Sequence, residues 1–154
     1  CHNQRLLLAN VLYNLCNSSG YECMIRLTSP SIVHFAYYNL ISFFNNFKIK
    51  VSYLAVPHER YIESISRSKV VVDMTSDPSQ SGISLRSFEA LGRGCKLLTN
   101  NHLIKNEDFY NENIIPLYSD FPTLADLRSS INKTVVPFDN SQLTLDYFIS
   151  KLLD

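Results

Sequence analysis

The chain has 154 residues, of which 45% are hydrophobic and 18% charged, a composition that suits one compact domain and excludes an intrinsically disordered protein. Its 14 basic and 14 acidic residues cancel, which excludes the one-sided positive charge of a typical nucleic-acid-binding domain, so we expect no nucleic-acid partner. The cysteines lack the spacing of a zinc site or a disulfide framework, and a reducing cytoplasm is the simplest compartment for them: Cys1, Cys16, Cys23 and Cys95.

The first third of the chain is predicted to form two helices and a strand. Apolar residues recur at helical spacing from Arg5 to Leu15, and the turn-forming sequence 17–20 ends that helix. Residues 21–27 predict a strand. Residues 29–47 predict a second helix, whose apolar side chains form one stripe: Val33, Tyr37, Leu40, Ile41, Phe44 and Phe47. We expect the aromatic residues from Phe35 to Phe47 to lie in the core, with an interdomain or self-association surface as the alternative.

The rest of the chain continues the alternation of strands and helices. Strands are predicted at four places: 49–56, 69–74, 95–100 and 113–118. Helices are predicted between and after them: 57–68, 83–93, 105–110, 123–131 and 141–153, the last capped by Ser141. This alternation predicts an α/β fold, a three-layer Rossmann-like domain with a mainly parallel sheet and helices on both faces. The apolar run at 32–44 is too short for a membrane span.

The beginning of the chain departs from the usual order of such a domain. A Rossmann-like domain starts with a strand, whereas the first element here is a helix, so we expect the sheet to lack its first strand. Either strand 21–27 pairs directly with strand 69–74, or the sheet has a gap that another chain fills. Because the sequence opens at Cys1 without a Met, we interpret residues 1–154 as a single domain taken from a longer protein.

The segment 79–101, SQSGISLRSFEALGRGCKLLTNN, carries the residues with the most chemical meaning. Ligands of parallel sheets bind at the carboxyl ends of the strands, and this segment contains or adjoins two of them. Gly82 comes just before the predicted helix, where the absence of a Cβ lets a phosphate approach backbone N–H groups at the positive helix end.

Arg86 and Glu89 lie three residues apart and therefore on one face of that helix. An Arg can bind a phosphate with two hydrogen bonds, and a carboxylate can accept both hydroxyls of a ribose. The spacing suits a nucleotide diphosphate. The simpler interpretation is a solvent-exposed ion pair that contributes a few tenths of a kcal/mol.

The order of these features resembles the carboxyl-terminal, donor nucleotide-binding domain of GT-B glycosyltransferases, above all the bacterial enzymes of lipopolysaccharide and capsule synthesis. The sequence EALGRG, which begins at Glu89, matches the second glutamate of the family pattern. The first glutamate of that pattern falls on Ser81, and the neighbouring Gln80 is also uncharged. Because the family uses that acidic residue to contact the donor sugar, a non-catalytic or degenerate nucleotide-binding or interaction domain is the alternative.

The resemblance implies a glycosyltransferase that binds a nucleotide-diphosphate sugar as substrate and needs neither a cofactor nor a metal. It implies substrate-binding roles, without a catalytic residue, for nine positions: Gln80, Ser81, Gly82, Ile83, Arg86, Glu89, Thr99, Asn100 and Asn101. Asp73 and Asp77 are interpreted as strand-end and turn residues rather than metal ligands.

The same resemblance predicts the partners and location of the parent protein. A glycan or lipid-linked acceptor would bind through a second domain, so we expect the isolated chain to bind the donor without transferring sugar. The predicted location is the cytoplasm, extending to the inner face of the membrane through peripheral association. Self-association is a further expectation, because the aromatic stripe of residues 35–47 offers a surface for it.

Overall fold

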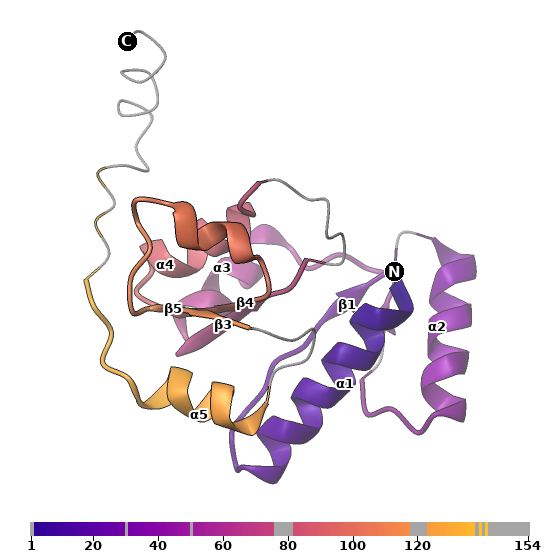
Figure 1. Ribbon diagram of the computed structural model, residues 1–154. Helices are drawn as coiled ribbons and strands as arrows, with labels where there is room; N and C mark the ends of the chain where they lie inside the picture. Colours follow the sequence, from indigo (N-terminus) through magenta and orange to yellow (C-terminus); the bar gives the residue numbers. More distant parts are fainter. Residues whose placement is uncertain are drawn as a thin grey trace, which may run out of the picture.

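The protein consists of two parallel sheets flanked by helices (Figure 1). The computed structural model describes residues 2–29, 31–49, 51–75, 82–117, 123–137, 139 and 141. The helices are α1 (His2–Ser18), α2 (Ile32–Phe44), α3 (His58–Ser66), α4 (Leu85–Gly92), the 3-10 helix η1 (His102–Asn106) and α5 (Leu124–Asn132). The strands are β1 (Leu27–Thr28), β2 (Val51–Ser52), β3 (Val70–Asp73), β4 (Lys96–Thr99) and β5 (Ile114–Pro116). The predicted α/β class is confirmed.

Every strand pairing among the described residues is parallel. The larger sheet has the order β3-β4-β5, with Asp73 opposite Thr99 and Thr99 opposite Pro116. The smaller sheet consists of β1 and β2, with Leu27 opposite Val51. A parallel sheet with crossover helices is the expected product of alternating strand and helix segments.

The two sheets are separate in the described residues, since β1 pairs only with β2 and β3 only with β4. The prediction that strand 21–27 pairs directly with strand 69–74 is therefore wrong, and the predicted gap in the sheet is present. The strand itself shrinks to Leu27 and Thr28, because residues 21–26 have no neighbouring strand to pair with. Instead, Cys23 and Ile25 pack in one hydrophobic cluster with Val72 of β3.

Helices cover both faces of the larger sheet. On one face, Leu91 of α4 and Leu97 of β4 are fully buried together with Ile65 of α3. On the other face, Leu98 packs against Leu12 of α1 and Leu127 of α5 in a second cluster. Because neighbouring residues of a strand point to opposite faces, Leu97 and Leu98 divide β4 between two cores. The result is the predicted three-layer arrangement.

Helix α1 joins the two sheets. Leu8 and Leu12 pack in the cluster beneath the larger sheet, whereas Leu6 and Ala9 pack in a third cluster with Val51 of the smaller sheet. Since α1 begins at His2 and ends at Ser18, it confirms and extends the helix predicted over 5–15.

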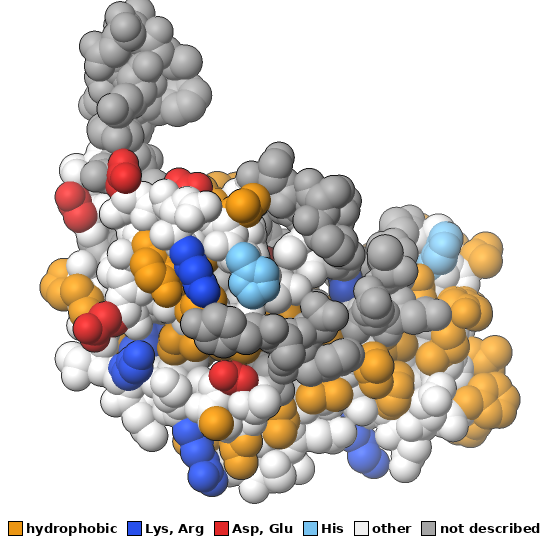
Figure 2. Space-filling view, viewed as in Figure 1, with side chains coloured by type: hydrophobic (Ala, Val, Ile, Leu, Met, Phe, Trp, Pro, Cys, Tyr) orange, Lys and Arg blue, Asp and Glu red, His pale blue; other side chains and the backbone are white. Residues whose placement is uncertain are grey.

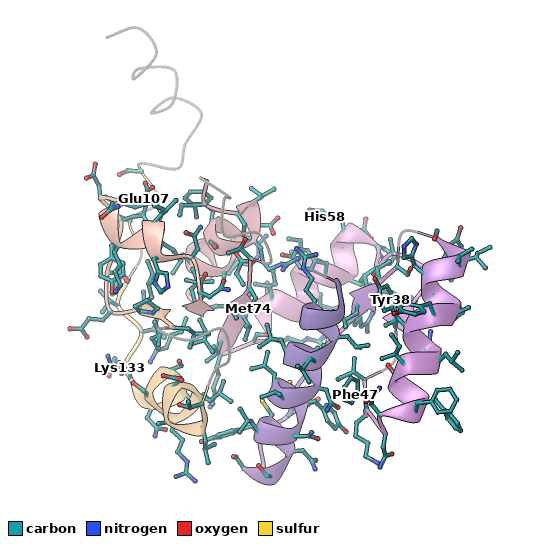
Figure 3. All side chains as sticks on the ribbon, turned by 45° about the vertical axis from the view of Figure 1, so that its right-hand side comes forward. Tyr38, Phe47, His58, Met74, Glu107 and Lys133 are labelled. Atoms are coloured by element: carbon teal, nitrogen blue, oxygen red, sulfur yellow. The ribbon has the colours of Figure 1, made fainter. Side chains whose placement is uncertain are left out.

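Helix α2 exists as predicted, but the expectation that its aromatic side chains lie in the core is wrong for Tyr37, Phe43 and Phe44, which are exposed. Val33 and Phe44 are each 76% exposed, and Tyr37 and Leu40 are also exposed. Tyr38 is buried instead, and Figure 3 shows it on the side of α2 that faces the rest of the molecule. The alternative, an interdomain or self-association surface, stays a prediction.

Contacts on the inner side of α2 explain this orientation. Asn39 Nδ2 donates to the backbone oxygen of Val51 in β2 at 3.2 Å, and Tyr38 packs in the cluster that contains Ile49. Ile41 and Phe47, also members of the predicted stripe, are half-buried in the same cluster. A tertiary hydrogen bond and one buried aromatic ring thus decide which face of the helix turns inward.

Other helix boundaries differ from the predictions by a few residues. Helix α4 begins at Leu85 rather than Ile83, because Ser84 caps it. The helix predicted at 105–110 is replaced by η1, which starts earlier, after its cap Asn101. Gly94 follows α4 with a φ of 71°, as its role as a helix stop predicts. The closing helix predicted at 141–153 lies outside the described residues, apart from Ser141.

Within the described ranges, every helix is too short or too polar to cross a lipid bilayer.

Candidate functional site

The predicted site lies where β3 and β4 end side by side. Asp73 is the last residue of β3 and stands opposite Thr99, the last residue of β4. Met74, labelled in Figure 3, follows directly at the carboxyl end of β3. The loop after β3 and the loop after β4 therefore start next to each other, as ligand sites of parallel sheets require.

Asp73 connects this edge of the sheet to the first turn of α4. The hydroxyls of Ser84 and Ser87 both donate to Oδ2 of Asp73, the latter at 2.8 Å. Arg86 Nη1 lies 3.5 Å from Oδ1 of the same carboxylate. A buried carboxylate is stable only when its oxygens are hydrogen-bonded or paired, and here three residues of one helical turn satisfy it.

Ser84 also fixes the start of α4. It has an extended backbone with φ −73° and ψ 148°, and its hydroxyl accepts a hydrogen bond from the backbone N–H of Ser87 at 3.3 Å. The first N–H groups of a helix have no acceptor within the helix and carry its positive dipole end. Because Asp73 holds Ser84, this positive end is located at the carboxyl edge of β3 and β4.

Arg86 and Glu89 meet near a tyrosine from the neighbouring helix α3. The Tyr61 hydroxyl donates to Oε2 of Glu89 at 2.9 Å. Burial is the main cause that raises the pKa of Tyr61, the hydrogen bond to Glu89 raises it further, and the nearby Arg86 guanidinium opposes the shift. The phenol therefore stays protonated and can act as the donor that orients Glu89. The side chain of Arg86 is 51% exposed, so it can also reach a ligand.

Two consecutive asparagines bind the loop segments on either side of residues 76–81. Asn100 Oδ1 accepts from the N–H of Thr75 at 2.9 Å, and its Nδ2 donates to the oxygen of Thr75 at 3.0 Å. Asn101 Nδ2 donates to the oxygen of Gly82 at 3.0 Å. Through these two asparagines, the end of β4 is hydrogen-bonded to Thr75, just before residues 76–81, and to Gly82, just after them.

The remaining predicted site residues occupy different environments. Gly82 is exposed and lies two residues before the helix cap, so its own amide is not part of the first turn of α4. Ile83 is half-buried against the core, and Thr99 is only 1% exposed and accepts from the N–H of Asn101 through Oγ1. Gln80 and Ser81 lie outside the described residues.

Asp73 and Tyr61 are the functional candidates that sequence reasoning missed. Asp73 was interpreted as a strand-end residue, although a carboxylate at the end of the apolar run VVVD is itself a signal of a buried polar contact. Tyr61 lies 28 positions before Glu89, and only the packing of α3 against α4 brings the two together.

The described residues include no group of three or more His, Cys, Asp or Glu side chains placed to hold a metal ion. A cavity of about 450 Å³ exists elsewhere, against β5 and α5, and none of the predicted site residues lines it.

Comparison with protein families gives a match over most of the described chain. A family model described as "Glycosyl transferase-like" matches residues 32–134, from the start of α2 to the end of α5. Searches among curated proteins and among solved structures found no significant match. The matched range is about two thirds of the chain and contains β3, β4, α4 and the side chains that converge there, so this α/β domain belongs to the glycosyl transferase-like family.

Proposed function

We propose that the chain is the carboxyl-terminal donor domain of a GT-B glycosyltransferase, which binds a nucleotide-diphosphate sugar for bacterial surface-glycan synthesis. The observation that carries the proposal is the position of α4. Its capped amino-terminal end is held by Asp73 at the carboxyl edge of two parallel strands, with Arg86 and Glu89 on the same helix. Membership of the glycosyl transferase-like family supports the reaction class.

The diphosphate would bind between the first turn of α4 and Arg86. The Asp73 carboxylate lies 3.5 Å from one guanidinium nitrogen, which leaves several of the five Arg N–H donors for phosphate oxygens. The backbone at Gly82 can approach the ligand closely because no side chain stands there, and nothing lies within 4 Å of the position of a Cβ at Gly82. A positive helix end and a guanidinium together match the charge of a diphosphate.

The ribose would bind Glu89. Its Oε2 is held by Tyr61, and its Oε1 has no hydrogen bond within the described part of the chain, so this oxygen can accept a sugar hydroxyl. The neighbouring wall of the cleft would be formed by Ile83, Asn100 and Asn101. Thr99 is buried and would contribute indirectly, because its Oγ1 accepts a hydrogen bond from the N–H of Asn101.

The donor sugar would face Gln80 and Ser81. During transfer, an acceptor hydroxyl attacks the anomeric carbon and loses its proton to solvent or to the leaving phosphate, the bond from that carbon to the phosphate oxygen breaks and the nucleoside diphosphate leaves. The helix end and Arg86 would stabilise the negative charge that develops on this leaving group, so the proposal requires neither a metal nor a cofactor. The acceptor, a glycan or a lipid-linked glycan, would be bound by a second domain, at the inner face of the cytoplasmic membrane.

Titration of the chain with UDP, GDP and their sugar conjugates, followed by NMR, tests the proposal. We expect millimolar or tighter binding by one of these nucleotides, with shifts at the amides of α4, and binding about tenfold weaker in Arg86→Ala. Arg128→Ala is the matched control, since Arg128 is an exposed arginine on α5. The absence of binding by any nucleotide, or equal affinity of both variants, would refute the proposal.

A non-catalytic or degenerate domain is the second candidate, and Ser81 in place of the family's acidic residue is the observation that favours it. Ser81→Glu in the full-length parent protein separates the two. Transfer that appears only in this variant would indicate degeneracy, whereas transfer by the unchanged protein would indicate a donor sugar that is recognised without that carboxylate.

A further inference from the structure

A cavity lies beside the outer edge of the larger sheet, away from the predicted donor site. Its volume of about 450 Å³ is within the range of small-molecule sites, about 300–1,000 Å³. Strand β5 forms one wall and α5 another, and Figure 1 shows α5 at the side of the molecule opposite α2. We call it the β5–α5 cavity. The polar side chains that line it include Tyr110, Glu112, Asp126, Ser129 and Lys133.

The backbone of β5 offers hydrogen-bond acceptors to this cavity but no donors. The backbone groups of Asn113 and Leu117 are hydrogen-bonded to β4. Because successive residues of a strand point their backbone groups to opposite sides, those of Ile114 and Pro116 face the outer edge. The N–H of Ile114 donates to the backbone oxygen of Asn111 at 3.0 Å, and Pro116 has no N–H. A further strand finds no donor there, whereas two carbonyl oxygens remain available.

Helix α5 presents one polar face to the cavity. Asp126, Ser129 and Lys133 are three and four residues apart and so lie on the same side of the helix. Oδ2 of Asp126 accepts from the N–H and the hydroxyl of Thr123, which leaves Oδ1 without a hydrogen bond among the described residues. At the other end of α5, Nζ of the buried Lys96 in β4 donates to the backbone oxygen of Lys133, which Figure 3 labels. Both ends of this wall are therefore fixed before a ligand binds.

The charges around the cavity balance. Glu112 and Asp126 are acidic, whereas Lys133 and the adjacent Lys96 are basic. Burial and the nearby Lys133 lower the pKa of Lys96, and Glu112 opposes the shift, so these three groups act on one another electrostatically. Figure 2 shows both basic and acidic side chains on the part of the surface where Figure 1 places α5. Such a site does not select a ligand of high net charge, such as a phosphate or a nucleotide.

We propose that the β5–α5 cavity binds neutral hexose units of a glycan. The hydroxyls around a sugar ring donate to carboxylate and carbonyl oxygens, and they accept from the Lys133 ammonium and the Ser129 hydroxyl. The C–H groups on the faces of the ring are apolar, and they can pack on the 39% exposed ring of Tyr110 and on Pro116. Donors, acceptors and an aromatic surface are thus present together, without excess charge.

The inference goes beyond the proposed function. In that proposal the chain binds a sugar only as part of the nucleotide donor, and a second domain binds the acceptor. The β5–α5 cavity shares no residue with the donor site, and its ligand carries no nucleotide. The two proposals can therefore fail separately.

An NMR titration of the isotope-labelled 154-residue chain tests the inference. The probes are neutral trisaccharides of glucose, galactose, mannose and N-acetylglucosamine, each added in turn, with glycerol as the control polyol. We expect one trisaccharide to bind at millimolar concentration and to shift the amides of residues 110–116 and 126–133. The amides of α4 should stay unchanged, whereas a nucleotide should shift those and leave the cavity unchanged.

Two pairs of variants locate the site. Glu112→Ala should weaken trisaccharide binding about tenfold, the value of one hydrogen bond to a charged group. Asp108→Ala is its matched control, since Asp108 is an exposed carboxylate nearby in the sequence that does not line the cavity. Ser129→Trp should fill the cavity and abolish binding, whereas Arg128→Trp, at the next exposed position of α5, should bind normally. Because Glu112 and Ser129 are both exposed, we expect the variants to fold.

Four results would overturn the proposal. These are no binding of any trisaccharide, equal shifts with glycerol, equal binding by the two members of either pair, or shifts confined to other parts of the chain. Spermidine is a further probe. If it binds the cavity and the trisaccharides do not, the carboxylates form a site for cations and the sugar assignment is wrong.

Discussion

At the scale of single residues, the carboxylate of Asp73 organises the edge of the sheet. It accepts hydrogen bonds from two serine hydroxyls and faces a guanidinium, and all three partners belong to the first turn of α4 or its cap. Removal of the carboxylate would leave the hydroxyl of Ser87, a fully buried residue, with only the long 3.4 Å contact to the Ser84 hydroxyl. An unsatisfied buried polar group costs about 1–3 kcal/mol.

Asp73→Ala should therefore lower the free energy of unfolding by about 2–3 kcal/mol and weaken nucleotide binding, because Arg86 and the start of α4 lose their common support. Urea unfolding followed by circular dichroism measures the first effect. Asp108→Ala removes an exposed carboxylate and should change the unfolding free energy by less than about 0.5 kcal/mol. Equal stability of the two variants would contradict the role assigned to Asp73.

At the scale of elements, the contact between α3 and α4 determines the direction of Glu89. Tyr61 of α3 donates to the Glu89 carboxylate at 2.9 Å, and Ile65 of α3 packs in one cluster with Leu91 of α4. The two helices are thus joined by one polar and one apolar contact on this face of the sheet. Diphosphate binding depends on Arg86 in the proposed site, whereas ribose binding depends on Glu89 and so on Tyr61.

Tyr61→Phe should weaken binding of a nucleoside diphosphate about fivefold to tenfold, the value of one hydrogen bond to a charged group, and leave inorganic pyrophosphate binding unchanged. Arg86→Ala should weaken both. Calorimetric titration measures the two ligands, with Tyr110→Phe as the control for loss of a partly exposed phenol hydroxyl. A parallel loss of both ligands in Tyr61→Phe would show that Tyr61 supports the fold rather than the ribose site.

At the scale of the whole molecule, α1 holds together two sheets that share no hydrogen bonds in the described residues. Cys23 lies in the segment between α1 and β1 and packs in one cluster with residues of α1 and β3. Burial raises the pKa of the Cys23 thiol to about 12, and the neighbouring Cys16 thiol contributes to the shift. The thiolate is the reactive form of cysteine, so this packing suppresses the reactivity of Cys23.

Alkylation at mildly alkaline pH measures that packing. Because the pKa of Cys23 is raised in the folded state, its thiol stays protonated at pH values well above the ordinary pKa of cysteine. Iodoacetamide should therefore modify Cys23 much more slowly in the folded chain than in denaturant, which peptide mass spectrometry can measure. Rapid modification of Cys23 in the folded chain would indicate that α1 and β3 do not pack against it as described.

The sequence predicted the edge of the sheet correctly but only part of the site. The positions of Arg86 and Glu89 on one helix follow from spacing alone, since α-helical geometry fixes which residues share a face, whereas Gly82 lies two residues before the helix cap rather than directly before the helix. The partners of those residues could not be predicted in this way. Asp73, Tyr61 and the two asparagines act across 11 to 28 positions of sequence, distances over which local periodicity carries no information.

The sequence by itself determined the α/β class and the order of helices and strands in the described residues, because apolar periodicity and turn residues act within one segment, whereas only the structure decided between direct strand pairing and a gap in the sheet. The tertiary structure decided which side of α2 faces outward, how far the strand at 21–27 persists and which side chains surround Arg86 and Glu89. These features depend on hydrogen bonds and packing between segments that are distant in the sequence. The residue pattern of one segment carries no information about which other segments pack against it.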